Sequence, residues 1–206
     1  MGKCLVVAAT AAEIGPFVRA MEGQQQKADV LITGVGMVAT AFSLGSVLGS
    51  KTYDYAINVG ICGAFSKDLS LGALTFVERD IFYELGAEDD EQFLSIEELG
   101  FGKASYQAIS GFPNKKISAL RKSVGLTVNR VHGNEASIAL AVERTAADIE
   151  SMEGAAFYYA CEQAGLPCAQ IRSVSNYVER RDRDKWQIGL AVAKLNEWLI
   201  SYFCSA

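Results

Sequence analysis

The chain has 206 residues, of which 50% are hydrophobic, and a formal net charge of −5 with a pI near 5.0. This length and apolar content suit one compact unit with a buried core, so we expect residues 1–206 to form a single domain. The 19 basic residues do not gather into one stripe, which argues against a nucleic-acid or anionic-membrane surface and favours a small-molecule ligand.

The cysteines indicate a reducing compartment. They are odd in number, scattered, and never spaced as C-x-x-C: Cys4, Cys62, Cys161, Cys168 and Cys204. The N-terminal residues begin a strand pattern without a basic leader, and no apolar run approaches the roughly 20 residues that span a bilayer. We therefore expect a cytoplasmic protein. His132 is the only histidine, which excludes a multi-histidine metal site.

Apolar runs typical of buried parallel strands recur along the chain, at 4–9, 28–33, 54–59, 72–77, 126–131 and 167–174. Helical patterns alternate with several of these runs, at 13–21, 37–48, 153–164 and 184–203. The alternation predicts an α/β fold, a three-layer sandwich with a central mixed, mostly parallel sheet. The segment 84–111 fits this pattern poorly. We interpret it as a surface excursion, either a lid or an oligomer contact, with a solvated acidic turn as the alternative.

Candidate functional residues follow the strands, because ligands of open α/β sheets bind beyond the carboxyl ends of the strands. Glu13 follows the first strand, Gly60 to Gly63 the third, and His132 the fifth. Glu150 to Glu153 lie between a short strand and a helix, and Arg172 to Asn176 end the last strand. Acids, an arginine and an amide are thus predicted to converge at one site.

Three features of the sequence have alternative interpretations. Glu153 also fits a first-turn acid favoured by the helix dipole. Gly34-x-Gly36 matches the start of a dinucleotide fingerprint, but that fingerprint expects an acid at the end of the next strand, where Gly60 stands. A dinucleotide-binding redox module is therefore the rival from a different functional class. His132 fits a satisfied structural histidine better than a ligand contact.

A family resemblance rests mainly on two segments, Glu150 to Ala156 and Arg172 to Asp182, the second followed by Trp186. Residues 34–36 and 58–63 give weaker support. Over nearly its whole length the chain resembles the nucleoside phosphorylase and nucleosidase superfamily, and within it the futalosine hydrolases. The resemblance implies hydrolysis of futalosine to hypoxanthine and dehypoxanthinyl futalosine in menaquinone biosynthesis, without a metal or organic cofactor. It also implies a homodimer or higher homo-oligomer. The rival of the same fold is another purine nucleosidase, of the methylthioadenosine/adenosylhomocysteine or inosine type.

The resemblance also implies roles for single residues. Glu13 would act as the general base on water, Glu153 would bond the ribose hydroxyls, and Arg172 would order both acids. Asn176 would complete the catalytic set. The substrate-binding residues would be Gly60, Ser151, Met152, Trp186 and Arg181. Trp186 would line the pocket for the 5′ substituent, whose carboxylate would pair with Arg181 or with Arg180 or Arg183. A solvated charged turn is the alternative for these arginines.

Departures from the superfamily narrow the chemistry. Phosphorolytic relatives hold phosphate with an arginine and a serine where this chain has Asn58 and Ile61, so water is the better nucleophile. Adenine-specific nucleosidases have a proton-donating aspartate at the position of Asn176. An amide cannot deliver a proton, but it can pair with a 6-oxopurine such as hypoxanthine. Ala136 replaces a stacking aromatic, so Tyr83 or backbone is expected to cover the base.

Overall fold

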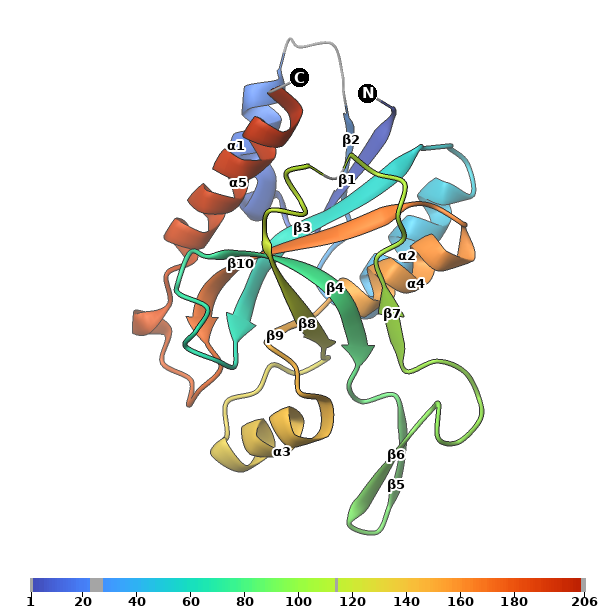
Figure 1. Cartoon of the computed structure of the whole chain (residues 1–206), viewed down its shortest axis with the longest axis vertical. Coiled ribbons are helices and arrows are strands. Elements are labelled where there is room, and N and C mark those ends of the chain that lie inside the picture. Colours follow the sequence, from blue (N-terminus) through green and yellow to red (C-terminus); the bar gives the residue numbers. More distant parts are fainter. Residues whose placement is uncertain (1, 23–27, 114, 205–206) are drawn as a thin grey trace.

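The computed structural model describes residues 2–22, 28–113 and 115–204 (Figure 1). Within them, eight strands form one mixed sheet. In chain order, these strands are β1 (Cys4–Ala8), β2 (Ala28–Ile32), β3 (Tyr55–Ala64), β4 (Leu74–Phe82), β7 (Ser105–Gln107), β8 (Arg121–Thr127), β9 (Ile149–Ser151) and β10 (Cys168–Tyr177). The predicted mixed sheet is confirmed.

Five of these strands close on themselves. The path β10-β4-β8-β9-β3 returns to its start, because β3 also pairs in parallel with β10. β4 and β9 supply the antiparallel pairs, with β10 and β3 respectively. β1 and β2 then extend the sheet from β3 as a parallel pair. An open three-layer sandwich does not describe this closed part, so the predicted layering is not established.

Helices pack on two sides of the sheet (Figure 1). On one side, α1 (Ala11–Met21) and α5 (Ile188–Cys204) lie together, and α5 packs on β3 and β10. On the other, α2 (Met37–Leu48) and α4 (Gly154–Gln163) lie together, and α4 packs on β4, β7 and β8. These four helices confirm the predicted helical segments to within a few residues.

A buried amide ties α5 to α1. The Asn196 side chain accepts a hydrogen bond from the Phe17 N–H at 2.9 Å and donates one to the Glu13 carbonyl at 2.8 Å. Phe17 and Phe203 pack beside this contact with ring centroids 5.4 Å apart. The helix that carries Glu13 is therefore fixed both by apolar packing and by a satisfied polar contact.

The segment 84–111 holds a hairpin of β5 (Gly86–Asp89) and β6 (Gln92–Ser95), followed by β7. The hairpin projects away from the sheet (Figure 1). A further helix, α3 (Glu135–Thr145), begins at Asn134, whose side chain caps it. A short 3₁₀ turn, η1 (Arg183–Lys185), precedes α5. No helix in the described ranges is long and apolar enough to cross a membrane.

Candidate active site

A cavity of about 310 Å³ opens at the carboxyl ends of β1, β3 and β10. Seven of the predicted site residues line it: Glu13, Ser151, Met152, Glu153, Asn176, Arg181 and Trp186. Two others, Gly60 and Arg172, are absent from its lining and lie behind it. The residues named from strand ends and from the family resemblance thus come from five separate segments of the chain that meet at or behind this cavity.

Glu13 is held by the start of its own helix. Thr10 is the N-cap of α1 and forms a capping box with Glu13, whose Oε2 accepts from the Thr10 N–H at 3.0 Å and from the Thr10 hydroxyl at 2.9 Å. The other oxygen, Oε1, accepts from the Ile61 N–H at 3.1 Å. Oε1 therefore keeps a lone pair that a water molecule in the cavity can approach.

Glu153 occupies the N-cap position of α4, but its side chain makes no capping bond. Its Oε1 instead accepts from the Gly36 N–H at 3.1 Å, and its Oε2 lies 3.3 Å from Arg172 Nη1. The carboxylate thus faces the cavity and not its own helix, which disfavours the interpretation as a helix-dipole acid. Gly36 has a φ of +98°, which favours glycine, and this turn serves to aim its N–H at Glu153.

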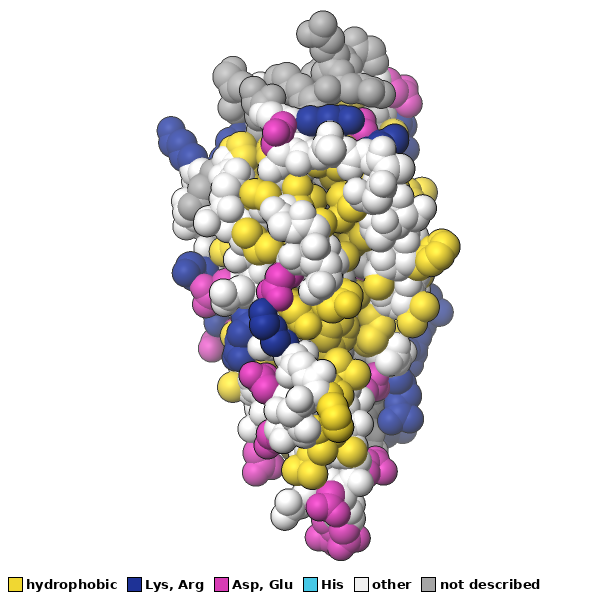
Figure 2. All heavy atoms as spheres, turned by 90° about the vertical axis from the view of Figure 1, so that its right-hand side faces the viewer, with side chains coloured by type: hydrophobic (Ala, Val, Ile, Leu, Met, Phe, Trp, Pro, Cys, Tyr) yellow, Lys and Arg dark blue, Asp and Glu magenta, His cyan; other side chains and the backbone are white. Residues whose placement is uncertain are grey.

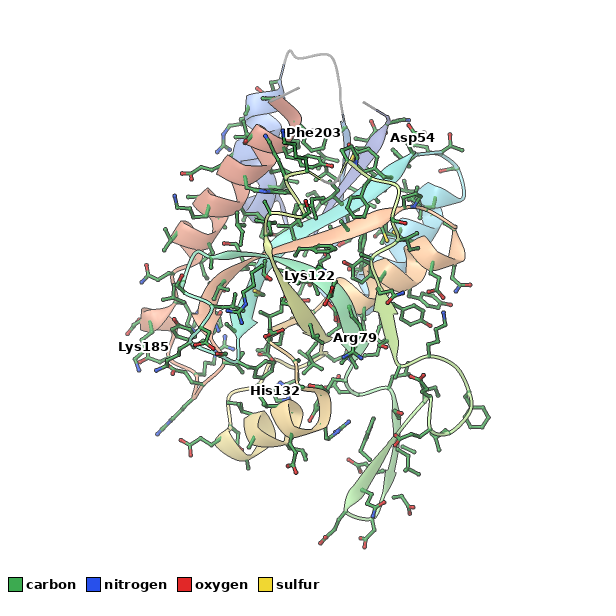
Figure 3. The ribbon with its side chains drawn as sticks, viewed as in Figure 1. Asp54, Arg79, Lys122, His132, Lys185 and Phe203 are labelled. Atoms are coloured by element: carbon green, nitrogen blue, oxygen red, sulfur yellow. The ribbon has the colours of Figure 1, made fainter. Side chains whose placement is uncertain are left out.

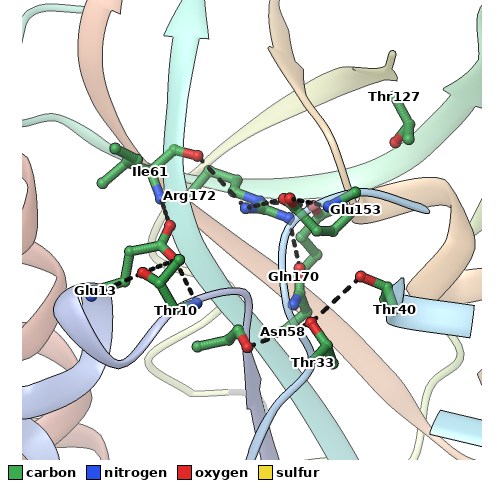
Figure 4. A network of polar contacts seen from close by, with 12 residues as sticks. Thr10, Glu13, Thr33, Thr40, Asn58, Ile61, Thr127, Glu153, Gln170 and Arg172 are labelled. Carbon is green, nitrogen blue, oxygen red and sulfur yellow. Dashed lines mark hydrogen bonds and ion pairs between the residues drawn. The ribbon is translucent and has the colours of Figure 1, made fainter. Parts of the chain in front are cut away.

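Each nitrogen of the Arg172 guanidinium donates a hydrogen bond to a neighbouring residue (Figure 4). It is only 1% exposed. Its Nη2 donates to Asn58 Oδ1 at 2.7 Å, its Nε to Gln170 Oε1 at 2.8 Å, and its Nη1 faces Glu153. Arg172 therefore orients Glu153 from behind the cavity wall. The hydrogen bonds to the Glu13 carboxylate come from Thr10 and Ile61.

Behind Arg172 lies a buried carboxylate that sequence reasoning missed. Asp80 is 1% exposed and accepts from Gln170 Nε2 at 2.9 Å and from the Thr127 hydroxyl at 2.7 Å. Burial raises the pKa of Asp80 to about 6. The Thr127 hydroxyl also accepts from the Ala155 N–H, at 2.7 Å, in the first turn of α4. Asp80 therefore fixes both the Gln170 amide that holds Arg172 and the helix that follows Glu153.

Gly60, which has no side chain, leaves room for the Arg172 guanidinium and the Glu13 carboxylate. A Cβ added to it would lie 2.4 Å from Arg172 Nη1 and 3.0 Å from Glu13 Oε1. Real Cβ contacts are longer than the first of these distances. The structure therefore gives this glycine a steric function beneath the site, whereas the family resemblance implied a substrate contact.

Asn176 borders the cavity at the end of β10 with its amide orientation fixed. Its Oδ1 accepts from the Ser175 hydroxyl at 2.7 Å, and its Nδ2 donates to the Tyr177 carbonyl at 3.0 Å. One amide hydrogen and one lone pair of Oδ1 remain for a ligand. The Ser175 hydroxyl also lies 3.0 Å from the Cys62 carbonyl, so its single hydrogen is shared between the two acceptors.

The positions that hold phosphate in phosphorolytic relatives offer nothing comparable here. Asn58 is 1% exposed and spends its amide on Arg172 Nη2 and, at 3.1 Å, on the Val7 carbonyl. Ile61 presents an aliphatic side chain to the cavity. Neither side chain offers an oxyanion a cationic hydrogen-bond donor.

Two further parts of the wall come from 131–132 and from the turn before α5. The His132 Nδ1 lies 2.6 Å from Glu150 Oε2, and both residues line the cavity. At the mouth, the Arg181 guanidinium lies 5.1 Å from the centroid of the Trp186 ring. Tyr83 is not part of this cavity lining but meets the His132 ring edge-on, with centroids 5.2 Å apart.

In the described part of the chain, no group of three or more His, Cys, Asp or Glu could hold a metal ion.

These features agree with the comparisons to known proteins. The model of the phosphorylase superfamily matches residues 14–201, so the chain belongs to that superfamily. It is 33% identical over 181 residues to a futalosine hydrolase of Streptomyces coelicolor, covering 82% of this chain and 75% of that protein. It is 31% identical over 173 residues to a futalosine hydrolase of Thermus thermophilus, covering 80% and 76% of the two chains. Within the superfamily, the chain is therefore a homologue of the futalosine hydrolases.

Solved structures share the fold. A methylthioadenosine nucleosidase variant of Helicobacter pylori, solved with 5′-methylthioadenosine in its active site, superposes with a TM-score of 0.86 at 18% identity, over 100% of both chains. The futalosine hydrolase of the same species superposes with a TM-score of 0.83 at 14% identity, over 99% of this chain and 98% of that one.

Proposed function

We propose that this chain hydrolyses the N-glycosidic bond of futalosine, releasing hypoxanthine and dehypoxanthinyl futalosine in menaquinone biosynthesis. The observation that carries the proposal is the Asn176 amide, whose orientation is fixed and which lines the cavity. The chain that holds it is 33% identical to a futalosine hydrolase. Residues 1–206 would act as one catalytic domain, without a metal or organic cofactor.

The site supports water as the nucleophile. Breaking the bond between C1′ and the purine builds positive charge on the sugar and electron density on the base. Glu153, held by Gly36 and Arg172, would bond the ribose hydroxyls beside Met152 and stabilise the cationic sugar. Glu13 would accept a proton from the attacking water through its free Oε1 lone pair, a role worth about 10² to 10⁴ in rate.

The base side supports a 6-oxopurine. The remaining amide hydrogen of Asn176 would donate to the 6-oxo group, and the remaining lone pair of its Oδ1 would accept from a ring N–H. Adenine would leave these groups unmatched, which is the kind of mismatch that discriminates strongly. Aliphatic side chains of Val35, Ile61 and Val131 would cover the base in place of an aromatic ring.

The residues at the mouth of the cavity fit a substrate with a bulky, anionic 5′ substituent. Trp186 and Arg181 both line the cavity, and their cation–π contact places a guanidinium above an apolar wall. Futalosine carries a carboxyphenyl ketone at this end. Arg181 would pair with its carboxylate, while Ser151 would support the sugar from the floor between Glu150 and Met152.

A substrate panel tests this proposal. Futalosine, inosine, methylthioadenosine and adenosylhomocysteine are offered separately in phosphate-free buffer, and the free base is measured by chromatography. Hypoxanthine from futalosine, at a kcat/KM well above that for inosine, is the expected result. Adenine release from the thio-nucleosides would instead favour the alternative nucleosidase activity.

We also propose a cytoplasmic homodimer. The face over α2 and α4 gathers apolar side chains (Figure 2). Val38 and Phe42 of α2 are 78% and 77% exposed, and Phe101, which lines a hollow together with Val38, is 79% exposed. Apolar surface of this kind marks protein contacts. Phe42→Glu should convert the dimer to a monomer in light scattering coupled to size-exclusion chromatography, whereas a monomeric wild-type protein would refute the proposal. Exposed Leu140, on α3 away from this face, supplies the control Leu140→Glu.

A further inference from the structure

The cavity contains an ionisable pair that the proposed mechanism leaves unused. His132 follows β8 and Glu150 lies in β9, and their side chains are 7% and 4% exposed. The imidazole Nδ1 lies 2.6 Å from Glu150 Oε2, and the His132 backbone N–H donates to Glu150 Oε1 at 3.1 Å. Figure 3 places His132 between α3 and the end of the sheet.

The pair lies beside the group assigned to the base. Gly63 separates the two, and the position that a Cβ would take on Gly63 is 3.3 Å from Asn176 Nδ2 and 3.5 Å from Glu150 Cγ. Glu150 and the Asn176 amide therefore flank the same point of β3. A purine held by Asn176 would lie within reach of the imidazole.

The second ring nitrogen of His132 is unused. The hydrogen bonds that His132 makes within the described residues involve its backbone N–H and its Nδ1, and none involves Nε2. Among the described residues, the fully buried side-chain polar atoms that lack a hydrogen-bond partner are the hydroxyls of Tyr55 and Ser151. Since Nε2 of His132 also lacks a partner but is not one of these atoms, it is not fully buried. His132 also borders a second hollow, between α3 and the hairpin, which would let the imidazole exchange protons with solvent.

The charge of this pair depends on two protons. With one proton shared at Nδ1 and another on Nε2, the pair has no net charge; after losing the second proton it has a charge of −1. Burial raises the pKa of the Glu150 carboxyl, against the lowering effect of its hydrogen bonds from His132. Whether the shared proton lies on Nδ1 or on the carboxylate, the protonated pair presents an N–H at Nε2.

We propose that His132, supported by Glu150, is the general acid of the reaction and delivers the Nε2 proton to a ring nitrogen of the departing purine. This inference rests on the proposed nucleosidase function. The C1′–N bond breaks and its electron pair goes to the purine, which takes the Nε2 proton. Water adds to C1′ and gives a proton to Glu13, which returns it to solvent, and solvent reprotonates His132. The amide of Asn176 cannot make this transfer.

Other charged and titratable groups face the pair from the segments packed around it. The Tyr83 ring meets the imidazole edge-on from the segment after β4, and Arg144 of α3 lies 4.4 Å over that ring. Glu179 and Arg181 face the cavity from the turn that approaches Gly133.

The pH dependence of kcat/KM on futalosine tests the inference, together with NMR of the single imidazole in protein without an affinity tag. Wild-type activity should fall with rising pH at the midpoint where the His132 C2–H resonance titrates. His132→Gln should lose about 10² to 10⁴ in kcat at neutral pH, and this alkaline limb should disappear. Glu150→Gln should move the limb to lower pH.

Control variants separate proton transfer from packing. Phe65→Leu loosens the ring contact with His132, at 6.2 Å between centroids, and should lower stability while keeping the alkaline limb. If the wild-type enzyme is active but the alkaline limb of its pH profile survives in His132→Gln, or does not move in Glu150→Gln, the inference about His132 is wrong. The proposed function would still stand. A folded wild-type protein that releases no base from futalosine would overturn the proposed function as well.

Discussion

Gly60→Ala should disable the site through a single methyl group. The new Cβ would lie 2.4 Å from Arg172 Nη1, about 1 Å closer than an ordinary contact of about 3.5 Å. The guanidinium cannot yield freely, because Asn58 and Gln170 hold it at 2.7 Å and 2.8 Å in a buried position. A shift of about 1 Å would break its contact with Glu153.

The expected cost follows from these contacts. Overpacking a buried site costs about 1 to 3 kcal/mol of unfolding free energy. A misplacement of about 1 Å at the catalytic carboxylate lowers kcat by about 10²-fold. Urea unfolding and futalosine turnover measure the two effects. Gly189→Ala is the control, since a Cβ there meets nothing within 4 Å. It should leave kcat nearly unchanged and should not lower the unfolding free energy, because alanine is the better helix former in α5. Wild-type kcat in Gly60→Ala would refute the steric role of this glycine.

The remaining predictions concern three polar groups. Glu153→Gln should lower kcat by at least about 10²-fold while its circular dichroism stays that of the wild type; retained turnover would remove Glu153 from the mechanism. Asn176→Asp should weaken futalosine hydrolysis and raise kcat/KM for methylthioadenosine, and an unchanged ratio would refute base selection by the amide. Asp80 has a raised native pKa, about 6, so the native state binds this proton more tightly than the unfolded state. Unfolding free energy should therefore fall by about 3 kcal/mol as pH rises from about 4 to about 6 and then level off, a slope that Asp80→Asn should abolish in urea titrations.

Sequence reasoning predicted which strand ends converge, but it missed the bounds of some of the elements that build the site. Acids, an arginine and an amide at strand ends could be recognised, because the carboxyl ends of neighbouring strands meet in space. The predicted strand at 126–131 is wrong in its bounds, since β8 spans Arg121–Thr127 and its amphipathic first half reads as polar. The α3 helix was missed because its exposed, short pattern carries little periodicity.

The network that supports Arg172 could not be predicted, because its residues lie inside strands and far apart in the sequence. β3 continues through Gly60 and Gly63, residues that usually indicate a strand end, because Arg172 and Asn176 fill the space that side chains would take. β4 continues through charged residues to Phe82 because Asp80 is satisfied by Gln170. Those partners lie 90 residues apart, so no local pattern could have joined them.

Isotope tracing tests the central claim most directly. Futalosine is turned over in phosphate-free buffer made with ¹⁸O-labelled water, and both products are analysed by mass spectrometry. The account predicts free hypoxanthine together with one ¹⁸O atom on the released sugar. Turnover that requires phosphate and yields an unlabelled sugar phosphate would contradict it.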